Sequence, residues 1–162
     1  MWYKKTLLPV ALLFLLASYL TWNNRASMSE ITAHELEKAF SGNHPMLVYF
    51  GFEDCPWCKE ALPIIMKVAK SERVQVSYFD TAAEENEEYY TTMKRVLCDE
   101  YNLDYILVPL VISIRVDGKI GGFHMGTVDN HNAISEKMTM EQVDELELIY
   151  AAIIQNWKET IS

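Results

Sequence analysis

The feature that most constrains the fold is an apolar run at residues 46–52, followed almost at once by Cys-Pro-Trp-Cys at residues 55–58. The run is nearly free of polar residues and rich in β-formers, which predicts a strand buried on both faces of a sheet. Residues 56–70 carry apolar side chains at helical spacing, which predicts a helix that Pro63 should kink. The sequence therefore places two cysteines at a junction between a buried strand and a helix.

The rest of the chain predicts further alternation of helices and strands. The segments Thr-x-x-Glu at 32–35 and Thr-x-x-Gln at 139–142 are capping boxes that begin helices, and Asp117-Gly118 is typical of a two-residue hairpin turn. In chain order we expect a helix at 32–40, strands at 46–52 and 74–78 around the helix at 56–70, a helix carrying Tyr90 to Tyr101, strands at 108–116 and 120–128, and a last helix carrying Val143 to Trp157. This order predicts an α/β fold with a central mixed sheet of about four strands flanked by helices.

A different kind of segment precedes this domain. Lys4 and Lys5 are followed by an uncharged, leucine-rich run at residues 6–22, the layout of a signal sequence or signal anchor. The large residues that end the run suit a signal peptidase poorly and favour an uncleaved transmembrane helix; a cleaved signal is the alternative. We therefore expect residues 1–28 to be a membrane anchor or signal sequence with a short linker, and residues 29–162 to be one domain. The lysines place that domain outside the cytoplasm.

Charge and cysteine content exclude several function classes. The formal net charge of −9 should repel nucleic acid, so we expect no nucleic-acid partner. Three cysteines cannot build a disulfide framework. Cys55 and Cys58 could be half of a zinc site, but the chain has no second pair of ligands at zinc spacing, and we expect neither a metal nor a cofactor. Cys98 is expected to be a buried, inert thiol, with a third redox partner as the alternative.

The position of Cys55 and Cys58 favours redox chemistry. The N–H groups and dipole at the start of a helix stabilise a thiolate at Cys55, and Cys58, one turn inside, can attack a mixed disulfide. We therefore expect Cys55 to be the exposed nucleophile and Cys58 the buried resolving thiol. Pro56 suits the first helical position, where its missing N–H would have no partner. Trp57 is expected to be exposed, either packing against substrate or covering the disulfide.

Over roughly residues 31–160 the sequence resembles the thioredoxin superfamily. The matching features are the dithiol after the strand Leu47-Val48-Tyr49-Phe50, Pro63 five residues beyond Cys58, Val108-Pro109 before the Asp117-Gly118 hairpin, and Gly126 near the end of the last strand. The resemblance implies a thioredoxin-like fold with a cis Val108–Pro109 bond against the dithiol, where the backbone of Val108 would pair with substrate. Together with the anchor, the sequence also looks like thioredoxin-like accessory proteins of Gram-positive bacteria, including those linked to bacteriocin export.

The chain departs from the thioredoxin pattern at one position. Thioredoxins place a buried aspartate six residues before the first cysteine, and Tyr49 stands there in this sequence. Glu53, Asp54 and water are the candidates for assisting proton transfer at Cys58.

These features predict an extracytoplasmic thiol-disulfide oxidoreductase that acts on protein thiols and disulfides. Because Glu53 and Asp54 oppose the helix dipole and Lys59, the dithiol should be moderately reducing, which favours reduction or isomerisation. A membrane partner would then have to supply electrons. The alternatives are a disulfide-forming oxidase and a non-catalytic accessory or chaperone that holds exported peptides in the groove near Pro109.

Overall fold

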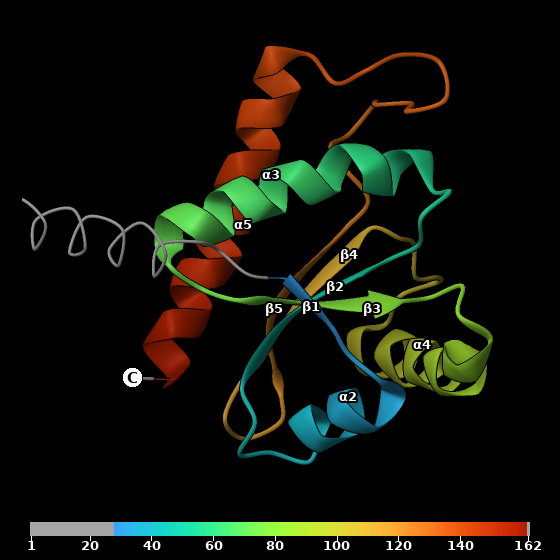
Figure 1. Cartoon of the computed structure of the whole chain (residues 1–162), viewed down its shortest axis with the longest axis vertical. Helices are drawn as coiled ribbons and strands as arrows, with labels where there is room; N and C mark the ends of the chain where they lie inside the picture. Colours follow the sequence, from blue (N-terminus) through green and yellow to red (C-terminus); the bar gives the residue numbers. More distant parts are fainter. Residues whose placement is uncertain (1–27, 162) are drawn as a thin grey trace, which may run out of the picture.

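The structure, a computed structural model, describes residues 28–161 (Figure 1). The predicted membrane anchor and nearly all of the predicted linker lie outside the described residues. Within residues 28–161, no helix is long and apolar enough to span a membrane.

The described chain alternates strands and helices, as predicted. The elements are β1 (Met28–Glu30), α2 (Ala33–Phe40), β2 (Met46–Gly51), α3 (Pro56–Glu72), β3 (Val76–Asp80), a 3₁₀ turn (Glu84–Asn86), α4 (Glu87–Tyr101), β4 (Leu110–Ile114), β5 (Ile120–Met125) and α5 (Met140–Ile161). The two predicted capping boxes are present: Thr32 exchanges hydrogen bonds with Glu35, and Thr139 with Gln142.

The strands form one mixed sheet in the order β1-β3-β2-β4-β5. Strands β1, β3 and β2 are parallel, and β4 is antiparallel to both of its neighbours, β2 and β5. Helices α3 and α5 cover one face of the sheet, and α2 and α4 cover the other (Figure 1). With the dithiol at the start of α3 and a cis proline before β4, this is a thioredoxin-like α/β fold.

Strand β2 lies at the centre of the sheet, which explains its unbroken apolar sequence. Leu47 and Tyr49 pack toward α3 and α5, whereas Val48 and Phe50 pack toward α2 and α4. All four side chains are almost fully buried. A strand covered on both faces has no solvent side, so the period-2 alternation of a half-exposed strand is absent.

The sheet has five strands, and the prediction of about four was too low. Met28–Glu30, where we predicted the end of the linker and no strand, forms β1 and pairs with β3. This strand is short and mostly exposed, so it carries no apolar alternation that the sequence could reveal.

The hairpin between β4 and β5 was predicted correctly, but its turn is of another type. Gly118 N–H bonds to the carbonyl of Arg115, and Gly118 alone has positive φ in this turn, at 78°. Asp117 therefore does not adopt the left-handed conformation that a two-residue type I′ turn needs, and the loop is longer. A side chain at 118 would also collide with the carbonyl oxygen of Phe40, which would lie 2.2 Å from its Cβ.

Candidate active site

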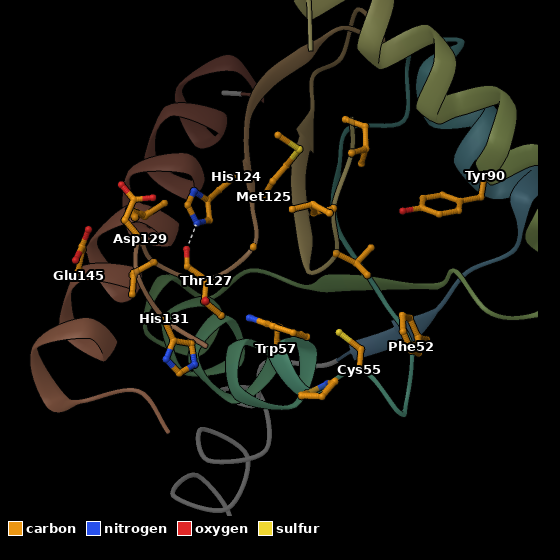
Figure 2. A pocket seen from close by; sticks show the side chains of 17 residues that line it. Phe52, Cys55, Trp57, Tyr90, His124, Met125, Thr127, Asp129, His131 and Glu145 are labelled. Carbon is orange, nitrogen blue, oxygen red and sulfur yellow. Dashed lines mark hydrogen bonds between the residues drawn. The ribbon is translucent and has the colours of Figure 1, made fainter. Parts of the chain in front are cut away.

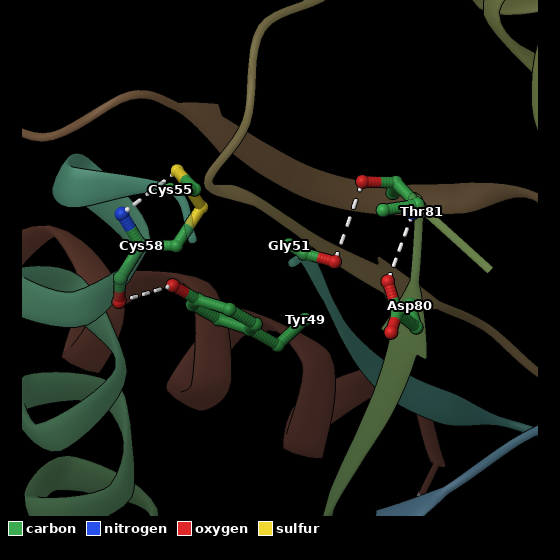
Figure 3. The surroundings of a disulfide bond; sticks show 7 residues. Tyr49, Gly51, Cys55, Cys58, Asp80 and Thr81 are labelled. Atoms are coloured by element: carbon green, nitrogen blue, oxygen red, sulfur yellow. Dashed lines mark hydrogen bonds between the residues drawn. A yellow bond between two sulfur atoms is a disulfide. The ribbon is translucent and has the colours of Figure 1, made fainter. Parts of the chain in front are cut away.

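The two cysteines of the Cys-x-x-Cys segment are joined by a disulfide at the start of α3 (Figure 3). Cys55 is the N-cap residue of the helix, and the backbone N–H of Cys58 donates to Cys55 Sγ at 3.1 Å. Pro56 is the first helical residue, as predicted. Cys55 Sγ thus accepts a bond from one of the free N–H groups at the positive end of the helix dipole. That environment stabilises a thiolate when the disulfide is reduced.

The exposure of the segment differs from the prediction. Cys55 is 3% exposed and Cys58 is 4% exposed, so in the disulfide form both cysteines are buried. Trp57, predicted to be exposed, is half-buried and packs against the hydrophobic core. The residues that cover Cys55 and Trp57 come from distant parts of the chain, so the local sequence did not indicate that these two residues would be covered.

A cavity of about 590 Å³ distinguishes the two sulfurs, because Cys55 lines it and Cys58 does not. Its wall is mostly apolar and comes from the α3 start, the segment before β4, the end of β5 and α5 (Figure 2). The lining residues are Phe52, Cys55, Pro56, Trp57, Tyr90, Ile106, Leu107, Val108, His124, Met125, Gly126, Thr127, Val128, Asp129, His131, Glu145 and Ile149. An incoming group in this cavity would therefore meet Cys55 first.

The Val108–Pro109 bond is cis, as the resemblance implied. Val108 lines the same cavity as Cys55 and Trp57. Pro109 is buried, and its carbonyl accepts the Gly126 N–H at 2.7 Å. The structure thus brings Trp57 and Val108 into the lining of one cavity, while direct contact of Pro109 with the sulfurs stays a prediction.

Pro63 lies inside α3, is exposed, and does not line the cavity beside Cys55. The helix continues through it to Glu72. Because proline has no N–H, the helical bond to the carbonyl four residues earlier, at Lys59, cannot form. The kink that we expect at this point stays a prediction.

The Tyr49 side chain lies against Cys58, at the start of α3. Its buried hydroxyl donates a hydrogen bond of 2.9 Å to the backbone carbonyl of Cys58. Burial, with Tyr150 and Tyr78 nearby, raises the pKa of Tyr49 far above its ordinary value, so this phenol stays neutral. Tyr49 is therefore an anchor for the start of α3 and not an acid. Sequence reasoning noted the missing aspartate but did not find this bond, which depends on how α3 lies on β2.

Gly51 leaves room for both the tyrosine and the sulfur. A Cβ at this position would lie 2.9 Å from Cε1 of Tyr49 and 3.2 Å from Sγ of Cys58. The backbone there is fixed as well, since the carbonyl of Gly51 accepts the backbone N–H of Thr81 at 2.9 Å. It also accepts the Thr81 hydroxyl at 3.3 Å (Figure 3). The Tyr49 ring, the Cys58 sulfur and the β2 backbone thus fit together with no spare volume.

The charged groups that precede and follow the dithiol compensate one another. Asp54 and Lys59 are exposed, and Asp54 Oδ1 lies 3.6 Å from Lys59 Nζ. Glu53 is also exposed, so neither Glu53 nor Asp54 is a buried acid of the thioredoxin kind. Exposed pairs of this sort act weakly and are screened by salt. The helix N-terminus therefore remains the main fixed influence on Cys55.

Sequence reasoning assigned no role to His131, which the structure brings to the site. Its side chain is fully buried and lines the cavity, and its Nε2 lies 3.2 Å from Glu60 Oε2. The same carboxylate oxygen accepts the backbone N–H of Met138 at 2.9 Å. Glu60 thus holds the loop after β5 against α3. No local motif marks this contact, because the paired residues lie far apart in the chain.

The remaining candidates were a metal site and Cys98. Within residues 28–161, no group of three or more His, Cys, Asp or Glu side chains is placed to hold a metal ion. Cys98 is a free thiol in α4 and is half-buried, which is less than the full burial that we expected.

Comparison with known proteins supports no family assignment. No protein family model matches the chain, and no curated protein is similar to it. Solved structures that resemble it include thioredoxin from Trypanosoma brucei brucei, at 16% identity and a TM-score of 0.49 over 81% of this chain and 94% of that one. Malassezia sympodialis thioredoxin matches at 15% identity and a TM-score of 0.48, over 82% and 92% of the two chains. Thioredoxin O2 from Arabidopsis thaliana in its oxidized state matches at 15% identity and a TM-score of 0.46, over 78% of this chain and 96% of that one. Likenesses this distant leave the function to be argued from the chain's own residues.

Proposed function

We propose that the protein is a thiol-disulfide oxidoreductase that acts on protein disulfides. The observation that carries this proposal is the Cys55–Cys58 disulfide at the N-terminus of α3, with Cys55 on the wall of a cavity. A structural disulfide would tie distant segments together, whereas this one joins residues one helical turn apart and constrains little of the chain. We therefore interpret it as a disulfide that is reduced and re-formed during the reaction.

The reaction needs only the two cysteines and the substrate. In the reduced enzyme, the Cys55 thiolate attacks one sulfur of a substrate disulfide, and the other sulfur leaves as a thiolate that takes up a proton. Cys58, after losing its proton, attacks Cys55 Sγ and releases the second substrate thiol. Two electrons have then passed to the substrate, and the enzyme holds the Cys55–Cys58 disulfide. A separate reductant must restore the dithiol. The reverse sequence would oxidise a substrate dithiol.

The cavity determines how substrate approaches Cys55. Trp57 and Val108 provide apolar surface beside this sulfur, and we assign them to substrate binding. We propose that the backbone of Val108, set by the cis bond to Pro109, pairs with the substrate chain. Cys58, buried and not on the cavity wall, is left to resolve the mixed disulfide.

We further propose that the domain works outside the cytoplasm on an N-terminal membrane anchor, in the reducing or isomerising direction. The support for the location is the placement of Lys4 and Lys5 before the apolar run. The support for the direction is that Glu53 and Asp54 precede Cys55 and oppose the stabilisation of its thiolate by the helix N-terminus. A membrane protein would then supply the electrons. Protease added to intact spheroplasts should remove the domain; protection would refute this location, and a mature N-terminus near residue 23 would refute the anchor.

A trapping experiment tests the catalytic assignment. Cys58→Ser should accumulate mixed disulfides through Cys55, because the resolving thiol is missing. Cys55→Ser is the matched control and should trap nothing, and both variants should carry Cys98→Ser to remove the free thiol. Trapping by the Cys55→Ser variant, with faster alkylation of reduced Cys58, would reverse the two roles.

A redox titration with glutathione or dithiothreitol tests the direction. We expect a potential nearer the thioredoxin value of about −270 mV than the roughly −120 mV of a strong oxidant. A value above roughly −150 mV would instead indicate a disulfide-forming oxidase.

The mostly apolar cavity also favours a second candidate, a non-catalytic accessory or chaperone that holds exported peptides. Such a binder needs neither sulfur. Full activity of the Cys55→Ser/Cys58→Ser variant in a complementation assay would support the binder, whereas loss of activity would support the enzyme.

A further inference from the structure

The cavity beside Cys55 has two chemically different ends. Figure 2 shows Phe52 and Tyr90 on one side and Asp129 and Glu145 on the other, with Trp57 between them. The first end continues into the apolar segment before β4, and Leu107 in that segment is 52% exposed. One end is therefore suited to an apolar side chain and the other to a cation.

The two carboxylates at the acidic end are exposed and unmatched. Asp129 follows β5, and Glu145 stands one turn before Ile149 on the cavity side of α5. Within residues 28–161, neither carboxylate forms a salt bridge or a side-chain hydrogen bond. Near α3, by contrast, Asp54 lies 3.6 Å from Lys59 and Glu60 lies 3.2 Å from His131. The acidic end of the cavity therefore carries two carboxylates that are free to pair with a cation of an occupant.

A second observation places an unfilled polar position in the same cavity. The His131 side chain is 0% exposed, and within the described residues neither of its ring nitrogens makes a hydrogen bond, although Nε2 lies 3.2 Å from Glu60. Buried polar atoms without a hydrogen bond are rare in folded proteins, because leaving them so is unfavourable. His131 lines the cavity, but its ring nitrogens have no accessible surface, so the wall would have to move before a polar group of an occupant could reach Nδ1.

We infer that the substrate is an extended cysteine-containing segment with an apolar residue on one side of the cysteine and Lys or Arg on the other. This inference rests on the proposed function. The cysteine would lie at Cys55, the apolar residue against Phe52 and Val108, and the cation between Asp129 and Glu145. An acidic substrate would meet these carboxylates and a chain whose net charge is −9. Charge complementarity therefore selects the substrate.

The test compares peptide disulfides that differ at one position. The full chain in detergent is reduced, and its kcat/KM is measured on peptides with Lys, Gln or Glu two residues before or two residues after the cysteine. Two exposed ion pairs should favour Lys over Glu about three- to tenfold on one of the two sides, with Gln between. The preference should shrink between about 0.05 and 0.5 M salt, because added salt shortens the Debye length and screens exposed charges.

Variants of Asp129 and Glu145 test whether these two carboxylates cause the preference for Lys over Glu. The double variant Asp129→Asn/Glu145→Gln should make the three peptides react at similar rates. The matched control is Glu141→Gln, which removes one exposed acid from the first turn of α5 without touching the cavity. It should keep the full preference.

Two outcomes would overturn the inference: equal kcat/KM for Lys and Glu peptides on both sides, or a preference that survives in the double variant. Hydroxyethyl disulfide, a small neutral substrate, separates this result from failure of the proposed function. If the wild-type chain does not reduce it, the oxidoreductase assignment itself is wrong. If it does and the peptides do not differ, only the substrate class is wrong.

Discussion

Adding one methyl group at Gly51 probes how tightly the dithiol is held. Gly51→Ala would place Cβ 2.9 Å from Cε1 of Tyr49 and 3.2 Å from Sγ of Cys58. Neither neighbour can move freely, because the Tyr49 hydroxyl is bonded to the helix and Cys58 is tied to Cys55. The strand backbone is held by Thr81. The methyl group must therefore push on the redox site itself.

The expected destabilisation follows from two opposing effects. Overpacking a filled core costs about 1 to 3 kcal/mol. Replacing glycine by alanine where φ is not positive stabilises by about 0.4 to 1 kcal/mol, since the unfolded chain loses freedom. Gly51 has no positive φ, so both effects apply, and the middle of each range gives a net loss of about 1 kcal/mol.

The matched control is Gly122→Ala in β5. There the added Cβ would have its nearest neighbours at 3.8 Å, an ordinary contact, and φ is again not positive. Equilibrium urea denaturation of the oxidised chains should show Gly51→Ala less stable than wild type and Gly122→Ala equal or slightly more stable. If both variants match wild type within about 0.5 kcal/mol, the typical spread of surface changes, the tight packing around Cys58 is refuted.

Three further changes test single contacts. Tyr49→Phe removes the 2.9 Å bond to the Cys58 carbonyl and should lower the free energy of unfolding by about 1 kcal/mol, so unchanged stability in urea would contradict the anchoring role. Gly118→Ala combines positive φ with a Cβ that would lie 2.2 Å from a backbone carbonyl oxygen of α2, and should cost more than about 2 kcal/mol in thermal unfolding. Arg115 lowers the pKa of Asp117 from 3.8 to about 2, so the stability from this pair is complete above pH 3.8 and is lost as the pH falls toward 2. The stability difference between wild type and Asp117→Asn should shrink over that interval, and a difference independent of pH would contradict the pairing.

The sequence was most informative where local patterns coincide with tertiary structure. The run at 46–52 predicted a central strand because a strand covered on both faces must be apolar throughout. The helix after Cys55 followed from Pro56 and the apolar spacing. The cis Val108–Pro109 bond could not be derived from spacing and came only from the resemblance.

The sequence was least informative where distant segments meet. Residues 28–30 form a strand because they pair with β3, and these three residues carry no β-pattern of their own. The partners of Glu60, namely His131 and Met138, lie in a polar loop that no motif links to α3. The acidic end of the cavity likewise exists because the segment after β5 lies beside α5. Such contacts depend on how elements pack, which local residue types leave open.

Tyr49 shows how a departure from a family pattern gains its meaning from packing. From the sequence, the residue marks only the loss of a buried carboxylate. In the structure its hydroxyl bonds to the Cys58 carbonyl, and burial keeps the phenol neutral because its pKa is raised. A neutral group cannot take the Cys58 proton or repel a thiolate there. The position therefore contributes geometry rather than charge, and proton transfer during exchange has to involve other groups or water.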